Sequence, residues 1–193
     1  MRVKSRWFRR DRPRTPPELG AAVAFIAWRV SHEALRRMRT ARFDVDPGPA
    51  YFAFLAEFLA FLIAYADRVA HDRWSAVTRS DFTTSLANRA GEILQDNAVD
   101  LLGAPGGNAK ASFIALVNER LSDYAAFECG DEGPDFAFLR CFAHRVSEIL
   151  PLHDRPWGVA QVVEVEAPDA IAVLRRAMDD LLACDLPRAE IAR

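Results

Sequence analysis

Hydrophobic residues recur at steps of three and four positions along most of the chain, a spacing that places them on one face of an α-helix. Between Leu19 and Met38 this spacing predicts a first helix that ends near Ala41. Thr15, two prolines and Glu18 precede the apolar stripe and match a helix N-cap with proline in the first turn. The basic residues near the other end suit the negative end of a helix dipole: Arg36, Arg37, Arg39 and Arg42.

Turn-forming residues divide the rest of the chain into further helices. We expect these helices at about residues 49–72, 78–103, 109–127, 134–150 and 170–183. The third begins near Thr78 or Ser80, where Ser80 and Asp81 can cap it. Residues 159–166 are ambiguous, because their valines favour a strand whereas no partner strand is expected elsewhere. We predict a helix there. Pro168 either kinks this helix or starts a new one.

Composition agrees with a single globular domain. The chain has 193 residues, of which 51% are hydrophobic and 27% charged, enough to build a core. We therefore predict an all-α, single-domain bundle of about six helices, with an aromatic-rich central helix at about 49–72. The expected organisation is a mobile basic arm at 1–14, the helical domain at 15–186 and a C-terminal tail at 187–193.

The three cysteines and the start of the chain bear on the compartment. Cys129, Cys141 and Cys184 form no CxxC pair and are odd in number, which fits a reducing environment. More arginines and then prolines follow Trp7 and Phe8, where a secretory signal needs an apolar run. We expect a cytoplasmic protein.

The first 14 residues concentrate positive charge. They hold seven of the 25 Lys and Arg residues, opposed only by Asp11, around two aromatic side chains. The residues of this arm that we expect to contact an anionic surface are Arg2, Lys4, Arg6, Trp7, Arg9 and Arg10. A membrane or a nucleic acid is a suitable surface, at about 1 kcal/mol per cation near an anionic bilayer. The alternative is a solubilising tail.

The central helix is apolar enough to raise the question of a membrane span. Residues 50–66 contain a single charge, Glu57, and a carboxylate at the centre of a span costs about 2.5 to 3.5 kcal/mol on insertion scales. At 100° per residue, small and charged residues share one narrow stripe, here called the alanine seam. Its members are Ala50, Ala53, Glu57, Ala60, Ala64, Asp67, Arg68 and His71. A lipid-facing helix has no reason for this segregation, so we predict a core helix and no transmembrane segment.

The alanine seam is also a candidate site for a metal ion or another ligand. Glu57, Asp67 and His71 share the seam, and His144 and Glu148 repeat a His/carboxylate pair four residues apart on the fifth helix. Facing helices with carboxylates and imidazoles are how helical bundles bind metals. Neither pair has the Glu-x-x-His spacing of di-iron bundles, and ordinary helix-surface pairs are the alternative.

The third helix presents a polar face with Asn88, Glu92 and Asp96 on one side. Such a face can bind a polar ligand or a partner. The alternative is a solvated surface of an amphipathic helix.

No nucleophile motif, glycine-rich nucleotide loop or zinc-binding spacing occurs in the sequence. We therefore expect a non-enzymatic helical interaction or adaptor protein with a protein partner, and we predict no cofactor. The alternative is a helical bundle that binds a small apolar ligand or a metal ion among its helices.

Overall fold

Six helical segments and one short hairpin make up residues 14–45, 47–103 and 108–183, which are the residues that the computed structural model describes. The first five helices are α1 (Pro16–Thr40), α2 (Pro49–His71), α3 (Ala76–Leu102), α4 (Ala109–Tyr124) and α5 (Phe136–Ile149). The sixth is continuous and comprises α6 (Arg155–Gln161), the π-helical turn η2 (Val162–Glu166) and α7 (Ala167–Ala183). The hairpin pairs β1 (Cys129–Gly130) with β2 (Gly133–Pro134). The predicted all-α helical bundle is confirmed.

The predicted start of α1 and end of α3 are confirmed by their caps. The Thr15 hydroxyl accepts a hydrogen bond from the backbone N–H of Glu18, and the Glu18 carboxylate accepts one from the Thr15 N–H at 2.9 Å. This reciprocal pair satisfies two N–H groups that the first helical turn leaves free. Gly103 closes α3 in the left-handed conformation, with φ of 62°, which suits a residue without a Cβ atom.

Two predicted helix boundaries were wrong. Helix α3 begins at Ala76 because the Ser75 hydroxyl accepts a hydrogen bond from the Thr78 N–H. The predicted caps Ser80 and Asp81 therefore lie inside the helix. Helix α4 ends at Tyr124 rather than Phe127, because the chain turns there toward the β1–β2 hairpin.

The ambiguous segment at residues 159–166 is helical, as predicted. The new feature is η2, a π-helical turn that directly precedes α7 and its proline, Pro168. Proline has no N–H to donate to the carbonyl of the preceding turn. The change of hydrogen-bond register in η2 lets the helix pass this position without ending.

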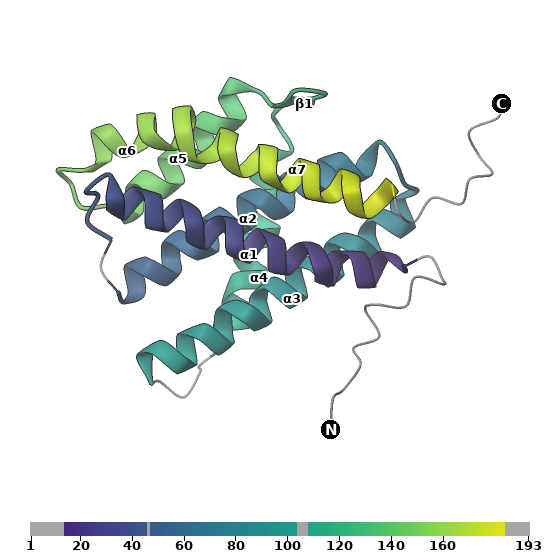
Figure 1. Cartoon of the computed structure of the whole chain (residues 1–193), viewed down its shortest axis with the longest axis horizontal. Coiled ribbons are helices and arrows are strands. Elements are labelled where there is room, and N and C mark those ends of the chain that lie inside the picture. The colour runs from purple at the N-terminus through teal and green to yellow at the C-terminus, as the bar shows by residue number, and fades with distance from the viewer. Residues whose placement is uncertain (1–13, 46, 104–107, 184–193) are drawn as a thin grey trace.

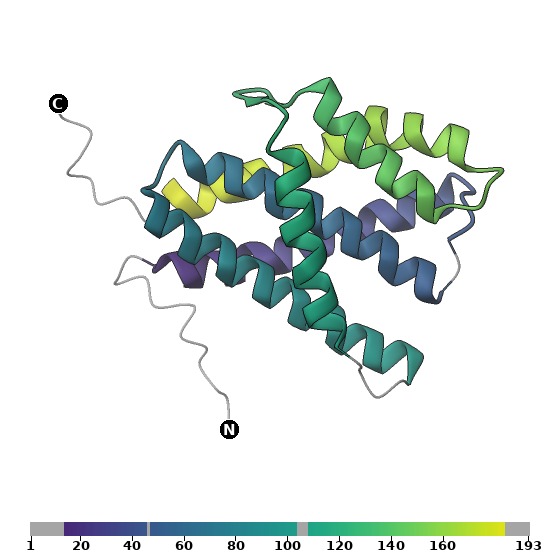
Figure 2. The same cartoon turned by 180° about the vertical axis from the view of Figure 1, so that it is seen from behind.

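Helix α2 lies at the centre, in contact with α1, α3, α4, α5 and α7 (Figures 1 and 2). Its phenylalanines interlock with those of α5: the rings of Phe61 and Phe142 stack with centroids 4.0 Å apart, and Phe58 meets Phe142 edge to face at 5.0 Å. Among the described helices, α2 is the one long and apolar enough to cross a membrane, and 67% of its most apolar stretch is buried in the bundle. The core helix of a soluble protein has these same properties, and the buried phenylalanines of α2 confirm the predicted aromatic-rich central helix.

The other helices cover α2 from two sides. Helices α1 and α7 pack against each other in opposite directions and face the viewer in Figure 1. From behind, α4 crosses over α2, and the α3–α4 pair projects from the body (Figure 2). Helix α1 packs most extensively on α3, where Gly20 lies so close to α3 that an added Cβ would sit 2.9 Å from the Leu86 nitrogen.

Candidate functional site

A surface groove opens between α2, α3 and α4. Helices α3 and α4 meet near their connection, where Lys110 and Phe113 pack over Gly91, and they diverge away from it (Figure 2). The hollow between them has a volume of about 570 Å³. Its apolar lining consists of Ala64, Ala87, Ile114, Val117, Leu121, Tyr124 and Ala125, and its polar lining includes Asp67, His71, Arg79, Asn88 and Asn118. We call it the α2–α3–α4 groove.

The alanine seam of α2 explains the position of this groove. In its middle, Ala60 and Ala64 are almost fully buried, because their small side chains let neighbouring helices approach closely. Toward the end of α2 the seam comes to the surface, where Asp67, Arg68 and His71 line the groove. The seam is therefore a packing contact in its middle and part of the groove lining at its C-terminal end.

Asp67 and His71 are joined by residues of α3. The Thr83 hydroxyl donates to Asp67 at 2.7 Å, and the Arg79 Nε lies 3.7 Å from the same carboxylate. Arg79 also reaches His71 Nδ1 at 2.8 Å. The cluster fixes the C-terminal end of α2 against the first turns of α3, and it forms one polar end of the groove.

The predicted polar face of α3 divides into three environments. Asn88 lines the groove, with its amide donating to the Thr84 carbonyl at 2.9 Å. Glu92 accepts hydrogen bonds from Arg89 at 2.9 Å and from Lys110 at 3.0 Å, and these two cations lower the pKa of its carboxyl group. Asp96 is exposed. Asn88 is thus the predicted face residue that reaches the groove.

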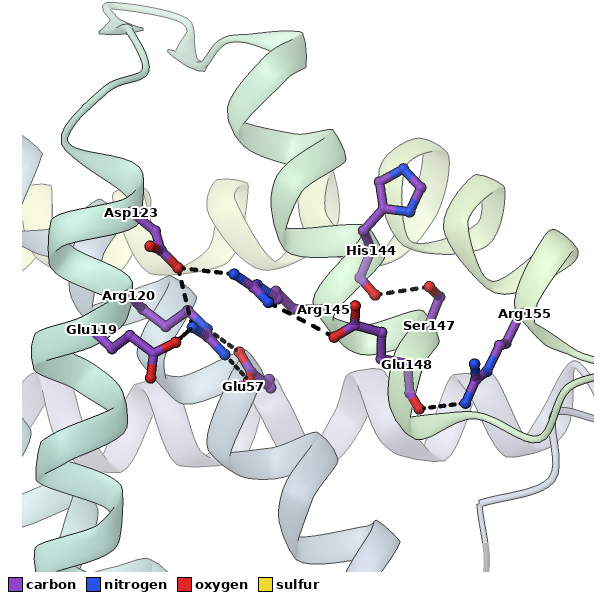
Figure 3. A network of polar contacts seen from close by, with 9 residues as sticks. All are labelled: Glu57, Glu119, Arg120, Asp123, His144, Arg145, Ser147, Glu148 and Arg155. Atoms are coloured by element: carbon purple, nitrogen blue, oxygen red, sulfur yellow. Dashed lines mark hydrogen bonds and ion pairs between the residues drawn. The ribbon is translucent and has the colours of Figure 1, made fainter.

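Glu57 takes part in a buried ion pair on the other side of α4. Its carboxylate receives two hydrogen bonds from the Arg120 guanidinium, Nε at 2.9 Å and Nη2 at 2.8 Å (Figure 3). The side chains are 11% and 8% exposed. Arg120 also contacts Glu119 at 2.6 Å and Asp123 at 3.1 Å. The hydrogen bonds that Arg120 donates to Glu57 raise the pKa of Arg120 above its ordinary value, so the guanidinium stays charged.

The ion pair continues toward α5 as a chain of charges. Asp123 bridges Arg120 and Arg145, the latter at 3.2 Å, and Arg145 lies 3.9 Å from Glu148 (Figure 3). The imidazole of His144 points away from this chain, and His144 joins the drawn contacts only through its backbone carbonyl, which accepts from Ser147. The predicted residues Glu57 and Glu148 are therefore linked through Arg120, Asp123 and Arg145.

The suggested metal site does not form among the described residues. In these parts of the chain no group of three or more His, Cys, Asp or Glu side chains comes together to hold a metal ion. The reason is that arginines hold the acids: Arg120 binds Glu57, and Arg79 lies between Asp67 and His71. His144 stands apart on the exposed side of α5.

The sequence patterns gave no site role to Arg120 or Tyr124. Both lie on the buried stripe of α4, which runs Phe113, Val117, Arg120 and Tyr124. An arginine within an apolar stripe signals a buried acid on a neighbouring helix. The Tyr124 hydroxyl is buried without a hydrogen-bond partner among the described residues. Burial is the main cause that raises the pKa of this phenol, and the charge of Glu57 raises it further.

Residues 1–13 of the basic arm lie outside the described residues, and with them Arg2, Lys4, Arg6, Trp7, Arg9 and Arg10. The same holds for the predicted tail at 187–193 and for Cys184.

Comparison of the chain with protein-family models, with curated proteins and with solved structures gives no match. The geometry of the groove and of the polar network is therefore what bears on function.

Proposed function

We propose that this protein is a non-enzymatic interaction protein that binds a partner protein in the α2–α3–α4 groove. The observation that carries the proposal is the groove itself, where apolar side chains from three helices are flanked by polar ones. A groove of this kind receives the apolar face of an amphipathic helix, which anchors through side chains one helical turn apart. Ile114, Leu121 and Ala125 on α4 provide matching steps of seven and four residues.

The packing of the interior favours a surface partner over an apolar ligand among the helices. The large aromatic side chains of α2 and α5 fill the space between these helices, with Phe54, Phe61 and Phe142 fully buried. Filled cores are the rule in proteins, and additional volume inside them is costly. The groove, in contrast, includes exposed residues such as His71 and Asn118, so a partner reaches it without displacing the core.

The charges beside the groove favour an acidic partner helix. The cations Arg68 and Arg79 face a single carboxylate in the groove lining, Asp67. Within the described chain, Arg68 forms no ion pair, and its guanidinium donates only to the backbone carbonyls of Tyr124, at 3.1 Å, and Phe127. Complementary charge steers encounter and fixes register more than it adds affinity. The partner we infer is an amphipathic helix with an apolar stripe flanked by acidic residues.

Affinity capture from the native host with two matched variants tests the proposal. Ile114→Glu places a charge on the partly exposed wall of the groove, whereas Leu152→Glu places the same charge on a 78% exposed residue between α5 and α6. We expect the unmodified protein and Leu152→Glu to retain the same specific partner and Ile114→Glu to lose it. A partner retained equally by all three proteins, or the absence of any specific partner, contradicts the proposal.

We further propose that the basic arm keeps the protein near an anionic surface, on the strength of its seven cations and two aromatic residues. Co-sedimentation with phosphatidylserine vesicles and with RNA, with and without residues 1–14, tests this. We expect the full chain to sediment with one of them at low salt and the truncated chain to lose most of this binding. Equal sedimentation of the two proteins contradicts the proposal.

A further inference from the structure

A second groove lies on the other side of the molecule, between α1 and α7, which face the viewer in Figure 1. Its volume of about 630 Å³ is within the range of small-molecule sites, about 300 to 1,000 Å³. Trp28 and Val173 are among its apolar lining residues, and Arg29, His32 and Arg37 are its basic ones. We call it the α1–α7 groove.

A fully buried carboxylate lies directly behind this groove. Glu166 belongs to the π-helical turn η2 and is 0% exposed. It accepts hydrogen bonds from Arg37 Nε at 2.8 Å and from Gln161 at 3.0 Å, and Arg37 Nη2 also lies 2.8 Å away. A buried charge is costly unless it is paired and hydrogen-bonded. π-helical turns occur often at functional sites, and this one supplies the carboxylate that holds Arg37.

The pair with Glu166 orients Arg37 toward the groove. Nε and Nη2 bind the buried carboxylate, while Nη1 lies 3.8 Å from Asp169, beyond hydrogen-bond distance. A guanidinium has five N–H donors in a rigid fork, so this arrangement leaves donors on the Nη1 side for another acceptor. The Arg37 side chain is 32% exposed and the Asp169 side chain 60%. Asp169 is thus a loose neighbour that an incoming anion can displace.

The surrounding charges also favour an anion. Arg29 is exposed and, among the described residues, takes part in no ion pair, and His32 is exposed on the same helix face. The nearby carboxylate Glu33 is already bound by Arg36 at 2.6 Å. Beside these basic side chains, Trp28 and Val173 offer an apolar surface. The groove therefore combines an oriented guanidinium, two further basic groups and an apolar wall.

We propose that the α1–α7 groove binds a small organic anion, whose carboxylate, phosphate or sulfonate group is held by Arg37 while its apolar body packs against Trp28 and Val173. Glu166 is the positioning residue that fixes the Arg37 fork. The site is separate from the α2–α3–α4 groove, so it is independent of the proposed partner binding.

Two fluorescent probes with the same aromatic body test the site: 8-anilinonaphthalene-1-sulfonate, which carries an anion, and N-phenyl-1-naphthylamine, which does not. We expect each full-length chain to bind one molecule of the sulfonate probe. Arg37→Gln and Glu166→Gln should each weaken its binding about tenfold, because a charge-assisted fork is lost or misdirected, while binding of the neutral probe stays unchanged. A substitution that only disturbs the structure of the groove weakens the binding of both probes equally.

Three further variants locate the site. Val173→Glu changes a 52% exposed wall residue and should weaken both probes, whereas Arg42→Gln, an exposed residue just after α1 and outside the groove lining, should change neither. Ile114→Glu in the other groove should also leave both probes bound. The proposal is overturned if the sulfonate probe does not bind at millimolar concentration. It is also overturned if Arg37→Gln and Val173→Glu bind it like the unmodified protein, or if Ile114→Glu removes it.

Discussion

Removing one partner of the buried Glu57–Arg120 pair should cost more stability than removing both. Glu57→Gln leaves the Arg120 charge in place, but Glu119 and Asp123 still lie 2.6 and 3.1 Å from it. The expected loss is therefore at the lower end of the range for breaking a buried pair, about 3 kcal/mol. Arg120→Met leaves Glu57 buried with no cation bonded to it in the described chain, and the upper end, about 5 kcal/mol, is expected.

The double variant Glu57→Leu with Arg120→Met distinguishes a true ion pair from general packing. Replacing both charges with apolar groups removes the desolvation cost together with the attraction, and such replacements are often neutral or stabilising. We therefore expect the double variant to be less destabilised than either single variant. Arg145→Met is the matched control, because its side chain is 35% exposed and pairs with Asp123 at 3.2 Å. Exposed pairs contribute less than about 1 kcal/mol.

Urea unfolding followed by circular dichroism measures these differences, provided that the slope of unfolding free energy against urea stays constant. In a thermal melt, a loss of about 3 kcal/mol corresponds to a fall in Tm of about 6 to 12 °C for a domain of this size. A Glu57→Gln protein within about 0.5 kcal/mol of the unmodified protein refutes the reasoning. A double variant whose loss equals the sum of the two single losses refutes it equally.

Three further predictions concern other parts of the fold. Glu92→Gln should reduce the loss of stability in acid. The lowered pKa of Glu92 in the folded state contributes stability above the ordinary value of 4.5, and this contribution disappears as the pH falls below that value. Urea unfolding at pH 6 and pH 3.5 measures the loss, and the same loss in the variant and the unmodified protein contradicts the prediction. Burial raises the pKa of the Cys129 and Cys141 thiols, so at pH 7.5 both should react with iodoacetamide more slowly in the folded protein than in the urea-unfolded chain. Peptide mapping by mass spectrometry measures the two rates, and equal rates count against burial of the thiols. Gly20→Ala should destabilise the protein by about 3 kcal/mol, because the added Cβ meets the backbone of α3. Gly48→Ala should cost much less, because nothing lies within 4 Å of the added Cβ. Comparable Tm values for the two variants contradict the close packing of α1 on α3.

The helices were predictable because their signals are local. The capping box at Thr15 and Glu18, the glycine after α3 and the apolar repeat of α2 each involve neighbouring residues. The start of α3 was misplaced because several polar residues in this segment are able to cap. Only the path of the chain out of α2 decides that Ser75 does so.

The site was less predictable because it depends on contacts between distant segments. Glu57 and Arg120 are 63 positions apart, and Arg37 and Glu166 are 129 apart. Two residues of the alanine seam, Asp67 and His71, line the α2–α3–α4 groove. The seam pattern did not reveal that arginines from other helices contact its carboxylates: Arg120 binds Glu57, and Arg79 lies near Asp67. These arginines are the reason why the metal site does not form. The divergence of α3 from α4 that opens the groove has no signature in either helix alone.

Site-specific photo-crosslinking tests the central claim most directly. A benzoylphenylalanine at position 121, in the wall of the α2–α3–α4 groove, is compared in the native host with the same group at position 152, which is exposed elsewhere. We expect one protein to be crosslinked from position 121 through an acidic amphipathic helix, with the product lost when Ile114→Glu is added and absent from position 152. No product from position 121, or the same product from both positions, contradicts partner binding in the groove.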